Sequence, residues 1–359
     1  MLTLGTHFDE LDRKIQPPKE RLEAARDLPP MVRDYLRQHE EFETVAPHSR
    51  IVGSYAQDLS VGDVKDVDIL VRVDGHAEAN EPQAKQLILD LKGALDGLPE
   101  ALGFEGYAGV DIERARRSVH VYLVGRDFHF DLVPCIAPNG FEEPLYVPDR
   151  GFNKWIPSHP VGFVALLDGL NTAHGGKMKR LGRLFKHFRD YQMKNRRPKS
   201  YWLGALLVHH VQSTLDMSQP LALLFRDLLD ALYKQYASLL GREDEATPNI
   251  PDPMLGHNIS WNWGRSHFET FMRRVDDGRK WAAMATEVAD REEAVAYWQK
   301  VFGEKYFPSD VTEAAKELAQ AGLPGVATVL PSGRVSAQRP ATGMSTPSGP
   351  TRFYGEKTD

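Results

Sequence analysis

The stretch IVGSYAQDLSVGDVKDVDILVRVD, residues 51–74, decides the fold because it ends in an apolar run that two aspartates interrupt. Asp66 and Asp68 are two residues apart, and residues two apart in a strand point to the same face. Val67 and Ile69 then fill the opposite face, toward a core. The pattern predicts a buried strand that holds two carboxylates side by side.

Neighbouring carboxylates repel each other, and burial raises the cost unless a cation or hydrogen-bond donors compensate. Oxygen ligands on rigid strands suit Mg²⁺, which binds one or two carboxylates and completes its shell with water and substrate phosphates. A third carboxylate would allow two ions, about 3.5 to 4 Å apart, to bind the attacking and leaving oxygens of a transfer reaction. The paired aspartates therefore indicate a site for Mg²⁺, with Mn²⁺ as the alternative ion.

A second strand offers the third carboxylate. In FHFDLVP, residues 128–134, Asp131 stands out from an otherwise apolar strand and shares one face with His129, which would line the same cleft. We predict Asp131 as the third catalytic and metal-binding carboxylate. Asp111 and Glu113 in VDIER also alternate with apolar residues and are the alternatives.

A glycine and a serine precede the paired aspartates. Gly53 and Ser54 follow the apolar pair Ile51-Val52, as expected for a strand that turns into a helix. A glycine lets backbone amides approach a phosphate closely, the serine hydroxyl adds a donor, and a helix N-terminus favours an anion. The sequence therefore predicts a phosphate-binding turn at Gly53 and Ser54.

The composition is that of a globular protein long enough for two domains, with 359 residues, 42% hydrophobic and 26% charged. The formal net charge of -6 provides no global attraction for nucleic acid or anionic membranes. No apolar run approaches the roughly 18 residues of a membrane span, and no signal peptide is evident. Cys135, the one cysteine, cannot form an internal disulfide. We expect a cytoplasmic protein without membrane contact.

Periodicity predicts an α+β fold with two lobes and a tail. Residues 1–156 would hold N-terminal helices, broken at Pro17-Pro18 and Pro29-Pro30, that pack on a mixed sheet with one helix at about 81–98. Residues 157–308 would form a helical lobe, and residues 309–359 a short helix and a disordered tail rich in Ser, Thr, Gly and Pro. The helices of the second lobe are expected at 160–173, 176–194, 200–215, 220–240, 261–277 and 279–303.

Two further features complete this reading. Residues 125–127, Gly-Arg-Asp, suit the hairpin connection that leads into the strand of Asp131. The tryptophans are interpreted as residues that pack between helices, at positions 261, 263, 281 and 298.

The order of a GS pair, a short spacer, DxD in a valine-rich strand and a distant aspartate resembles the nucleotidyltransferase superfamily of the DNA polymerase β type. The match covers about residues 50–134. The resemblance implies a polymerase β-like core followed by a helical lobe. It also implies Mg²⁺-dependent transfer of a nucleoside monophosphate from a nucleoside triphosphate, with release of pyrophosphate.

Segments of the predicted helical lobe resemble one family within this superfamily. GKMKRLGRLFKHFRDYQ and RPKSYWLGALLVHHV are similar to segments of the cGAS/DncV-like nucleotidyltransferases (CD-NTases). IPDPMLGHNISWNW and AVAYWQKVFGEKYFP are similar to the C-terminal part of that family, so that the likeness spans about residues 45–308. It implies that Lys186 and Ser200 contact the donor triphosphate and that Tyr201 stacks on a base. The spacer departs from the pattern, because SYAQDLSVGDVKD replaces a Gly-Thr or similar small pair; Gln57 is the spacer residue expected to contact the nucleotide.

The family resemblance implies a product and partners. CD-NTases make cyclic di- or trinucleotide second messengers from NTPs, ATP among them, and the product activates an antiphage effector in the systems called CBASS. A regulatory or conjugating protein that docks on the C-terminal tail is a further expectation. The residues leave open whether a nucleic acid activates the enzyme, which bases it prefers, and the ring size and linkage of its product.

Other interpretations fit parts of the sequence. The basic run KMKRLGRLFKHFRDYQMKNRRPK suits an RNA- or tRNA-directed nucleotidyltransferase or toxin, and the fold also suits a binding module without catalysis. Arg183 and Lys186, one helical turn apart, fit a solvated helix face. Ser200 fits a helix N-cap, and Tyr201 fits a core position.

Overall fold

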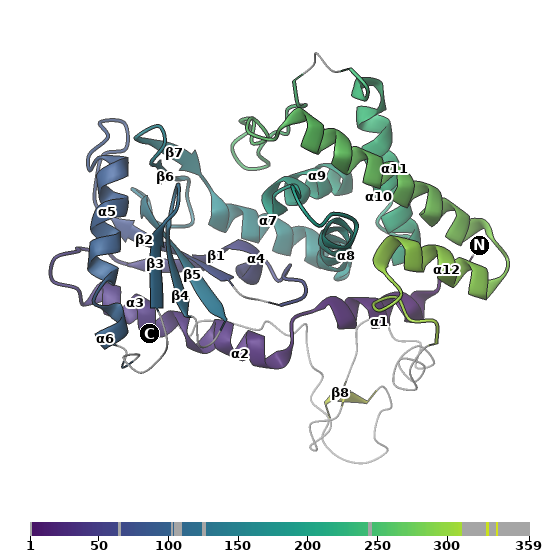
Figure 1. Cartoon of the computed structure of the whole chain (residues 1–359), viewed down its shortest axis with the longest axis horizontal. Helices are drawn as coiled ribbons and strands as arrows, with labels where there is room; N and C mark the ends of the chain where they lie inside the picture. The colour runs from purple at the N-terminus through teal and green to yellow at the C-terminus, as the bar shows by residue number, and fades with distance from the viewer. Residues whose placement is uncertain are drawn as a thin grey trace.

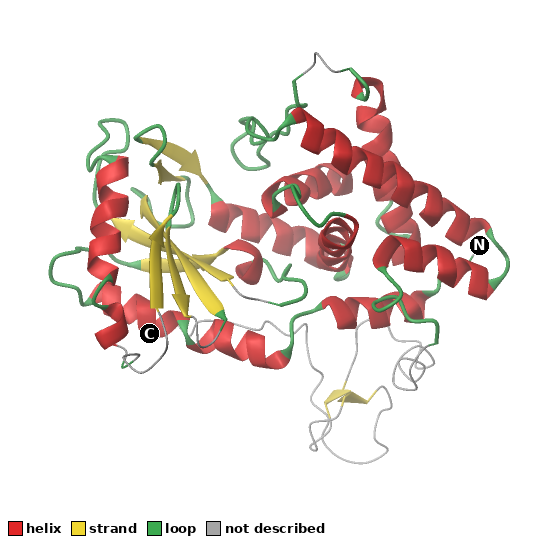
Figure 2. Ribbon diagram, in the orientation of Figure 1, coloured by secondary structure: helices red, strands yellow, loops and turns green. Residues whose placement is uncertain are grey.

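A sheet lobe and a helical lobe make up the molecule, and helix α7 (Pro160–Ala173) leads from one to the other (Figure 1). The computed structural model describes residues 2–63, 66–101, 103, 110–123, 127–242 and 246–310, and the backbone of two short strands at 328–329 and 335–336. Figure 2 separates the strands of one lobe from the helices of the other. The expected α+β fold is confirmed.

The sheet is mixed, as the sequence predicted. Its described strands run in the order β1-β2-β5-β4-β3, and β6 pairs with both β5 and β7. The central pair, β2 and β5, is parallel, whereas the other pairs are antiparallel. The strands are β1 Ser49–Val52, β2 Asp66–Val73, β3 Val110–Arg114, β4 Val119–Leu123, β5 Phe128–Ile136, β6 Leu145–Asp149 and β7 Lys154–Ser158.

One face of β2 lies in the core, and this face is the predicted one. Val67, Ile69 and Val71 are at most 1% exposed and pack with α5 (Ala84–Leu95), which lies where the sequence placed the helix of this lobe. The helical turn α6 (Leu98–Ala101) follows it. The acidic positions of β2 are therefore left on the opposite face of the sheet.

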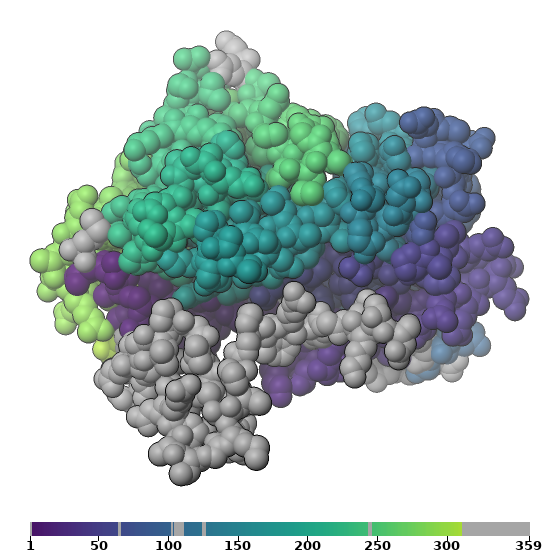
Figure 3. Space-filling view, turned by 180° about the vertical axis from the view of Figure 1, so that it is seen from behind, coloured from purple at the N-terminus to yellow at the C-terminus, as the bar shows by residue number. Residues whose placement is uncertain are grey.

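The N-terminal helices divide between the lobes. Breaks at the two Pro-Pro pairs separate α1 (Gly5–Ile15), α2 (Lys19–Asp27) and α3 (Pro29–Arg37). Helices α2 and α3 pack on the sheet as expected, but α1 does not, because Phe8 and Leu11 join the core of the helical lobe. Figure 3 shows the purple N-terminal residues on both lobes.

The helical lobe surrounds α8, the basic helix of the sequence. Its first four helices agree with the predicted ranges, and a 3₁₀ turn at Ala237–Leu239 follows them. None of the helices in the described ranges has the length and apolar character needed to cross a membrane. The further helices are α8 Lys177–Gln192, α9 Ser200–Ser213, α10 Leu221–Tyr236, α11 Arg265–Glu287 and α12 Arg291–Phe302.

The predicted boundary between the last two helices is wrong. Helix α11 continues through Gly278, and the break comes ten residues later, where the side chain of Asp290 accepts a hydrogen bond from the backbone N–H of Glu293 and caps α12. A Cβ at Gly278 would lie 2.7 Å from the ring of Phe188. The glycine therefore serves close helix packing and does not end a helix.

Two strands were not predicted at all. Strands β6 and β7 each contain a proline, Pro148 and Pro157, which argues against a central strand but is tolerated in short strands at the margin of a sheet. The hairpin between β4 and β5 is present, although residues 124–126 of its connection lie outside the described residues. The expected helix and disordered tail after residue 310 also lie outside them, apart from β8 (Thr328–Val329) and β9 (Val335–Ser336).

Candidate active site

Three acidic side chains meet on one face of the central strand pair. Strands β2 and β5 are parallel and in register, so that Asp68 lies beside Asp131 and Asp66 beside His129. Neighbouring strands are about 4.8 Å apart, and these residues alternate with buried ones on both strands. The structure thus brings Asp66, Asp68 and Asp131 together on the face opposite the core.

Two of the three carboxylates, those of Asp68 and Asp131, lie where burial makes a negative charge unfavourable. Burial raises the pKa of Asp68 to about 7, and the charges of Asp131 and Asp66 add to the effect. Burial also raises the pKa of Asp131, against the opposing effect of His120 and His129. Each added negative charge at this place costs free energy, and a bound cation would reverse that cost.

The oxygens available here fit a hard divalent ion. Oδ1 of Asp131 is buried and accepts no hydrogen bond of ordinary geometry from the described residues. No three His, Cys, Asp or Glu side chains within those ranges are arranged to hold an ion by themselves. A carboxylate set that leaves positions for water and substrate phosphates is what Mg²⁺ and, by the same chemistry, Mn²⁺ accept.

A histidine that the sequence reasoning missed lies against this group. His120 on β4 is in register with Asp131, and its Nδ1 contacts Oδ1 of Asp131. The rings of His120 and His129 are 6.1 Å apart. The alternation of SVHVYL, with Val119 and Val121 buried, was the available signal, since it places His120 on the acidic face.

The alternative carboxylates are too far away. Asp111 and Glu113 lie on the same face of the sheet, but on β3, where Glu113 is in register with His120. Two strand spacings separate β3 from β5, which is roughly 10 Å. Asp131 is therefore the carboxylate that neighbours the pair on β2.

Gly53 lies directly over Asp68. Helix α4 (Gly53–Ala56) is a single turn, and a Cβ at Gly53 would lie 1.8 Å from Oδ2 of Asp68. The φ of Gly53 is +74°, which also favours glycine. Ser54 Oγ lies 3.3 Å from Oγ of Ser60, and Gln57 donates its backbone N–H to Gly53 O at 3.1 Å. The predicted turn is present and touches the acidic group, although its helix has only four residues.

Lys186 and Arg183 are both buried, so the alternative of a solvated helix face is wrong. Lys186 is 7% exposed and forms no hydrogen bond or ion pair within the described part of the chain. Burial lowers its pKa to about 8, with a further decrease from Arg189, while Asp66 and Asp68 oppose the decrease. The ammonium group therefore lies within electrostatic range of the acidic group.

Ser200 and Tyr201 are the first two residues of α9, and Ser200 contacts α8. Lys199 occupies the N-cap position without a side-chain cap, so Ser200 does not cap the helix; its Oγ accepts a hydrogen bond from Arg189 at 3.1 Å. The Tyr201 hydroxyl donates to Asp252 at 2.9 Å, and its ring packs edge-on against Phe163, with centroids 4.9 Å apart.

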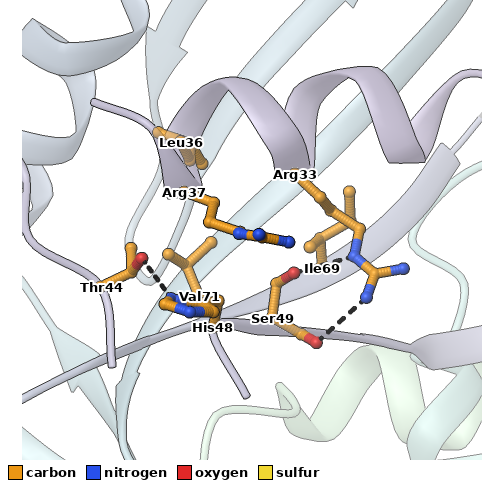
Figure 4. Close-up of a pocket in the computed structure, with 8 residues that line it drawn as sticks. All are labelled: Arg33, Leu36, Arg37, Thr44, His48, Ser49, Ile69 and Val71. Carbon is orange, nitrogen blue, oxygen red and sulfur yellow. Dashed lines mark hydrogen bonds between the residues drawn. The ribbon is translucent and has the colours of Figure 1, made fainter. Parts of the chain in front are cut away.

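A small pocket lies elsewhere, between α3 and β1 (Figure 4). Arg33 donates to Ser49 Oγ at 2.8 Å there, and Thr44 Oγ1 lies 2.8 Å from His48 Nδ1. Ile69, which belongs to the core face of β2, forms its wall. The pocket is thus on the other side of the sheet from the carboxylates and is separate from the candidate site.

Comparison with known proteins identifies the family that the sequence matches. The sequence pattern of the Second Messenger Oligonucleotide or Dinucleotide Synthetase domain matches residues 2–171. A cyclic AMP-AMP-AMP synthase of Acinetobacter sp. (strain ATCC 27244 / 9458) is 27% identical over 316 residues, which are 85% of this chain and 86% of that protein. Residues 2–171 belong to the CD-NTase family. CD-NTases are metal-dependent nucleotidyltransferases, and the resemblance found in the sequence is confirmed.

Solved CD-NTase structures share the fold. CdnC of E. coli MS115-1 with ATP has a TM-score of 0.64 at 17% identity, over 86% of this chain and 99% of CdnC. DncV of Vibrio cholerae with the linear intermediate pppA(3′,5′)pG has a TM-score of 0.66 at 15% identity, over 87% of this chain and 99% of DncV. The polymerase β-like core with a helical second lobe is therefore the architecture of this CD-NTase.

Proposed function

We propose that this CD-NTase is a cytoplasmic enzyme that joins NTPs, ATP among them, into a cyclic di- or trinucleotide that serves as a second messenger in antiphage defence. The observation that carries the proposal is the register of Asp68 with Asp131, beside Asp66 and within electrostatic range of the unpaired Lys186. The similarity to a cyclic AMP-AMP-AMP synthase and to a structure that holds a linear intermediate supports stepwise synthesis.

Asp66, Asp68 and Asp131 would hold two divalent ions, Mg²⁺ in the first place. Bound there, the ions supply positive charge to the triphosphate and lower the pKa of the attacking hydroxyl. Asp131 accepts the proton of that ribose hydroxyl, since burial raises the pKa of its carboxyl group and a carboxylate beside a metal ion can act as a general base. His120, in contact with Oδ1 of Asp131, orients this carboxylate.

The remaining residues position phosphates, which is most of what phosphoryl transfer requires of a protein. Gly53 allows the turn of Ser54 to approach the carboxylates, and Lys186 offers an ammonium group that no side chain neutralises within the described ranges. The Ser200 hydroxyl already accepts a hydrogen bond from Arg189, so its own hydrogen is available to a phosphate oxygen. Gln57 and Tyr201 complete the nucleotide site in this proposal.

The RNA-directed alternative loses the part of its support that came from α8. A basic stripe for an RNA backbone must face solvent, whereas Arg183, Lys186 and Arg189 are at most 8% exposed. Lys177 donates to three carbonyl groups of residues 217–219, and Lys179 pairs with Asp168 at 2.7 Å. Most basic residues of α8 thus serve the interior of the protein, whereas Lys194, Arg196 and Arg197, beyond its end, are exposed.

A protein partner remains part of the proposal. CdnC of E. coli MS115-1 has been solved in complex with a HORMA protein, so a neighbour in fold binds another protein. We extend this to a regulatory or conjugating partner of the present chain. Residues 311–359, which would carry the docking segment, lie outside the described residues apart from two short strands.

The test is synthesis from labelled NTPs with Mg²⁺ or Mn²⁺, followed by phosphatase treatment and mass spectrometry of resistant products. A cyclic product supports the proposal, and a linear tail added to RNA would support the alternative. Because activity in solution can require a partner, metal-dependent binding of a nonhydrolysable ATP analogue provides a second measurement.

Two variants locate the chemistry. The double variant Asp66→Asn/Asp68→Asn should lose at least about 1,000-fold in rate, equal to about 4 kcal/mol of transition-state stabilisation. It should fold at least as stably as the native protein, because like charges are removed. Asp111→Asn, on the same face but two strands away, is the matched control. Full turnover by the double variant would refute the site.

A further inference from the structure

Two exposed aromatic rings face each other across the lobes. Phe152, in the turn between β6 and β7, is 54% exposed, and Trp261, in the loop before α11, is 50% exposed. Their ring centroids are 6.0 Å apart. Trp261 therefore does not pack between helices as the sequence reasoning expected. Figure 1 shows the loop before α11 on the side of the helical lobe that faces β6 and β7.

Positive charge surrounds the two rings. The Arg116 guanidinium lies 4.8 Å from the centroid of the Phe152 ring and 5.4 Å from that of Trp261. Nε of Arg116 donates to the fully buried carboxylate of Asp149 at 2.9 Å. Lys154 Nζ lies 5.2 Å from the centroid of the Phe152 ring.

Arg117, next to this group, is 3.6 Å from Asp149 and its side chain is 42% exposed. The two arginines thus share one buried carboxylate, and Lys154 adds a third cation beside the Phe152 ring, so these groups carry a surplus of positive charge. We call Arg116, Arg117, Phe152, Lys154 and Trp261 the rim cluster.

The rim cluster continues into the candidate active site. Lys199 Nζ lies 5.3 Å from the centroid of the Trp202 ring, which stacks on Trp263 in the loop that carries Trp261. Burial lowers the pKa of Lys199, and the charges of Arg117 and Arg116 add to this effect. Lys199 directly precedes Ser200, whose hydroxyl bonds to Arg189. Cationic side chains therefore lead from the carboxylates past the phosphate-positioning residues to the two rings.

The ring of Trp261 is presented by a well-fastened loop. The Trp202 Nε1–H donates to Ile259 O at 2.9 Å, and the Trp202 ring stacks on that of Trp263 at 4.8 Å. Asp252 accepts from the Tyr201 hydroxyl at the other end of the loop. On the sheet lobe, the backbone N–H of Arg150 donates to Arg116 O at 3.0 Å. Because both loops are already held in place, binding a ligand here costs little conformational entropy.

We propose that the rim cluster binds the linear oligonucleotide intermediate between successive transfers, with a base stacked on Phe152 and Trp261 and a phosphate held by Arg117 and Lys199. The inference rests on the proposed function and names a subsite for it. Aromatic faces combined with exposed cations are the means by which proteins hold single-stranded nucleic acid without reading its sequence. The surplus of positive charge favours this ligand over a peptide, unless that peptide is acidic.

The test compares two ligands at equilibrium. One is a linear 5′-triphosphorylated adenylyl-adenosine whose terminal ribose lacks the 2′- and 3′-hydroxyl groups, and the other is a nonhydrolysable ATP analogue. The native protein should bind the dinucleotide more tightly. Trp261→Ala and Phe152→Ala should each raise the ratio of the dinucleotide Kd to the ATP-analogue Kd at least fivefold. Met284→Ala, at another exposed apolar side chain, 42% exposed on α11, should leave the ratio unchanged.

A second variant tests the phosphate contact. Arg117→Gln leaves Arg116 to neutralise Asp149, so it should fold, and it should reduce the salt dependence of dinucleotide binding by about one unit of slope. In the synthesis assay, the aromatic variants should release more linear product relative to cyclic product.

Several results would overturn the inference. A native protein that binds the dinucleotide no more tightly than the ATP analogue lacks the subsite. Equal weakening of both ligands by the aromatic variants would identify the cluster as a clamp between the lobes, and preference for an acidic peptide over the dinucleotide would identify a docking surface for proteins. A protein that forms no product and shows no metal-dependent binding of the ATP analogue, but still binds the dinucleotide through Trp261, would instead contradict the proposed function and retain the subsite.

Discussion

Arg183 and Lys186 lie one turn apart on α8, are both buried, and differ in what neutralises them. Arg183 donates to both carboxylate oxygens of Asp12 on α1, each at 2.8 Å, and to Asp58 O at 3.2 Å. Lys186 has no such partner within the described ranges and lies near the acidic group of the sheet lobe. Arg183 therefore stabilises the fold, whereas Lys186 is available to bind a ligand.

The electrostatics of the two residues follow the same division. Asp12 raises the pKa of Arg183 despite burial, whereas burial lowers the pKa of Lys186 to about 8. A buried charge without a partner costs free energy in the unliganded protein. Such a cost is retained where binding recovers it, and the triphosphate of a nucleotide would do so.

The largest effect should follow from breaking the paired cation. Arg183→Met removes two hydrogen bonds of 2.8 Å from the buried carboxylate of Asp12, which keeps Arg180 Nε at 3.3 Å, and should lower the free energy of unfolding by about 3 kcal/mol. Urea unfolding measures the change. Arg183→Met/Asp12→Leu should recover most of the loss, because both charges are then removed together. A loss below about 1 kcal/mol in the single variant would contradict the structural role.

The same substitution at the unpaired cation should affect function instead. Lys186→Met removes a charged contact to phosphate, worth about 1.5 to 3 kcal/mol, and should weaken binding of the ATP analogue about 10- to 100-fold. The unfolding free energy at pH 7 should not fall, because no partner is left unpaired. If the variant instead binds the ATP analogue as tightly as the native protein and is less stable, Lys186 has a structural role and not a binding role.

Two glycines extend the comparison to the backbone. Gly53 and Gly62 have similar positive φ angles, +74° and +67°, but a Cβ meets Asp68 at the first and nothing within 4 Å at the second. Gly53→Ala should therefore destabilise the protein by about 2 kcal/mol more than Gly62→Ala, since overpacking is added to the same backbone strain. Thermal unfolding of both variants gives the difference, and equal losses would show that Asp68 simply moves aside.

The pH dependence of stability should carry the smallest signal. The pKa of Lys186 lies at about 8 in the folded protein and at 10.5 when unperturbed, so the unfolded chain binds the extra proton between these values. Stability of the unliganded protein should therefore rise as the pH increases through this window, by roughly 1 to 2 kcal/mol between pH 8 and 9.5. Lys186→Met should lack that rise, and parallel curves for the two proteins would contradict the lowered pKa.

Local periodicity was enough to predict the acidic face. Alternation placed Asp66 and Asp68 opposite Val67 and Ile69, and the same rule isolated Asp131, because strand geometry repeats every two residues whatever surrounds it. The convergence of two strands could be expected from their charges, but the register of Asp68 with Asp131 could not be predicted, since parallel pairing joins residues far apart in the sequence. The roles of these residues remain predictions.

The features that could not be predicted from the sequence depend on contacts between distant segments. Arg183 resembled a surface cation until its partner on α1 was located, and Trp261 resembled a packing residue until its loop was placed against the sheet lobe. His120 is one more polar residue in an alternating strand unless its neighbour Asp131 is known. In each case the residue type was visible and its partner was not.

The division of the N-terminal helices has a mechanical consequence. The chain passes from α1 in the helical lobe to α2 on the sheet, and again from β7 of the sheet into α7 (Figure 1). Between α4 and β2, Leu59 is buried in the core of the helical lobe, and the Gly62 N–H donates to Ile15 O at 2.7 Å. Segments far apart in the sequence thus connect the same two lobes, and together they oppose rotation of α8 away from the carboxylates.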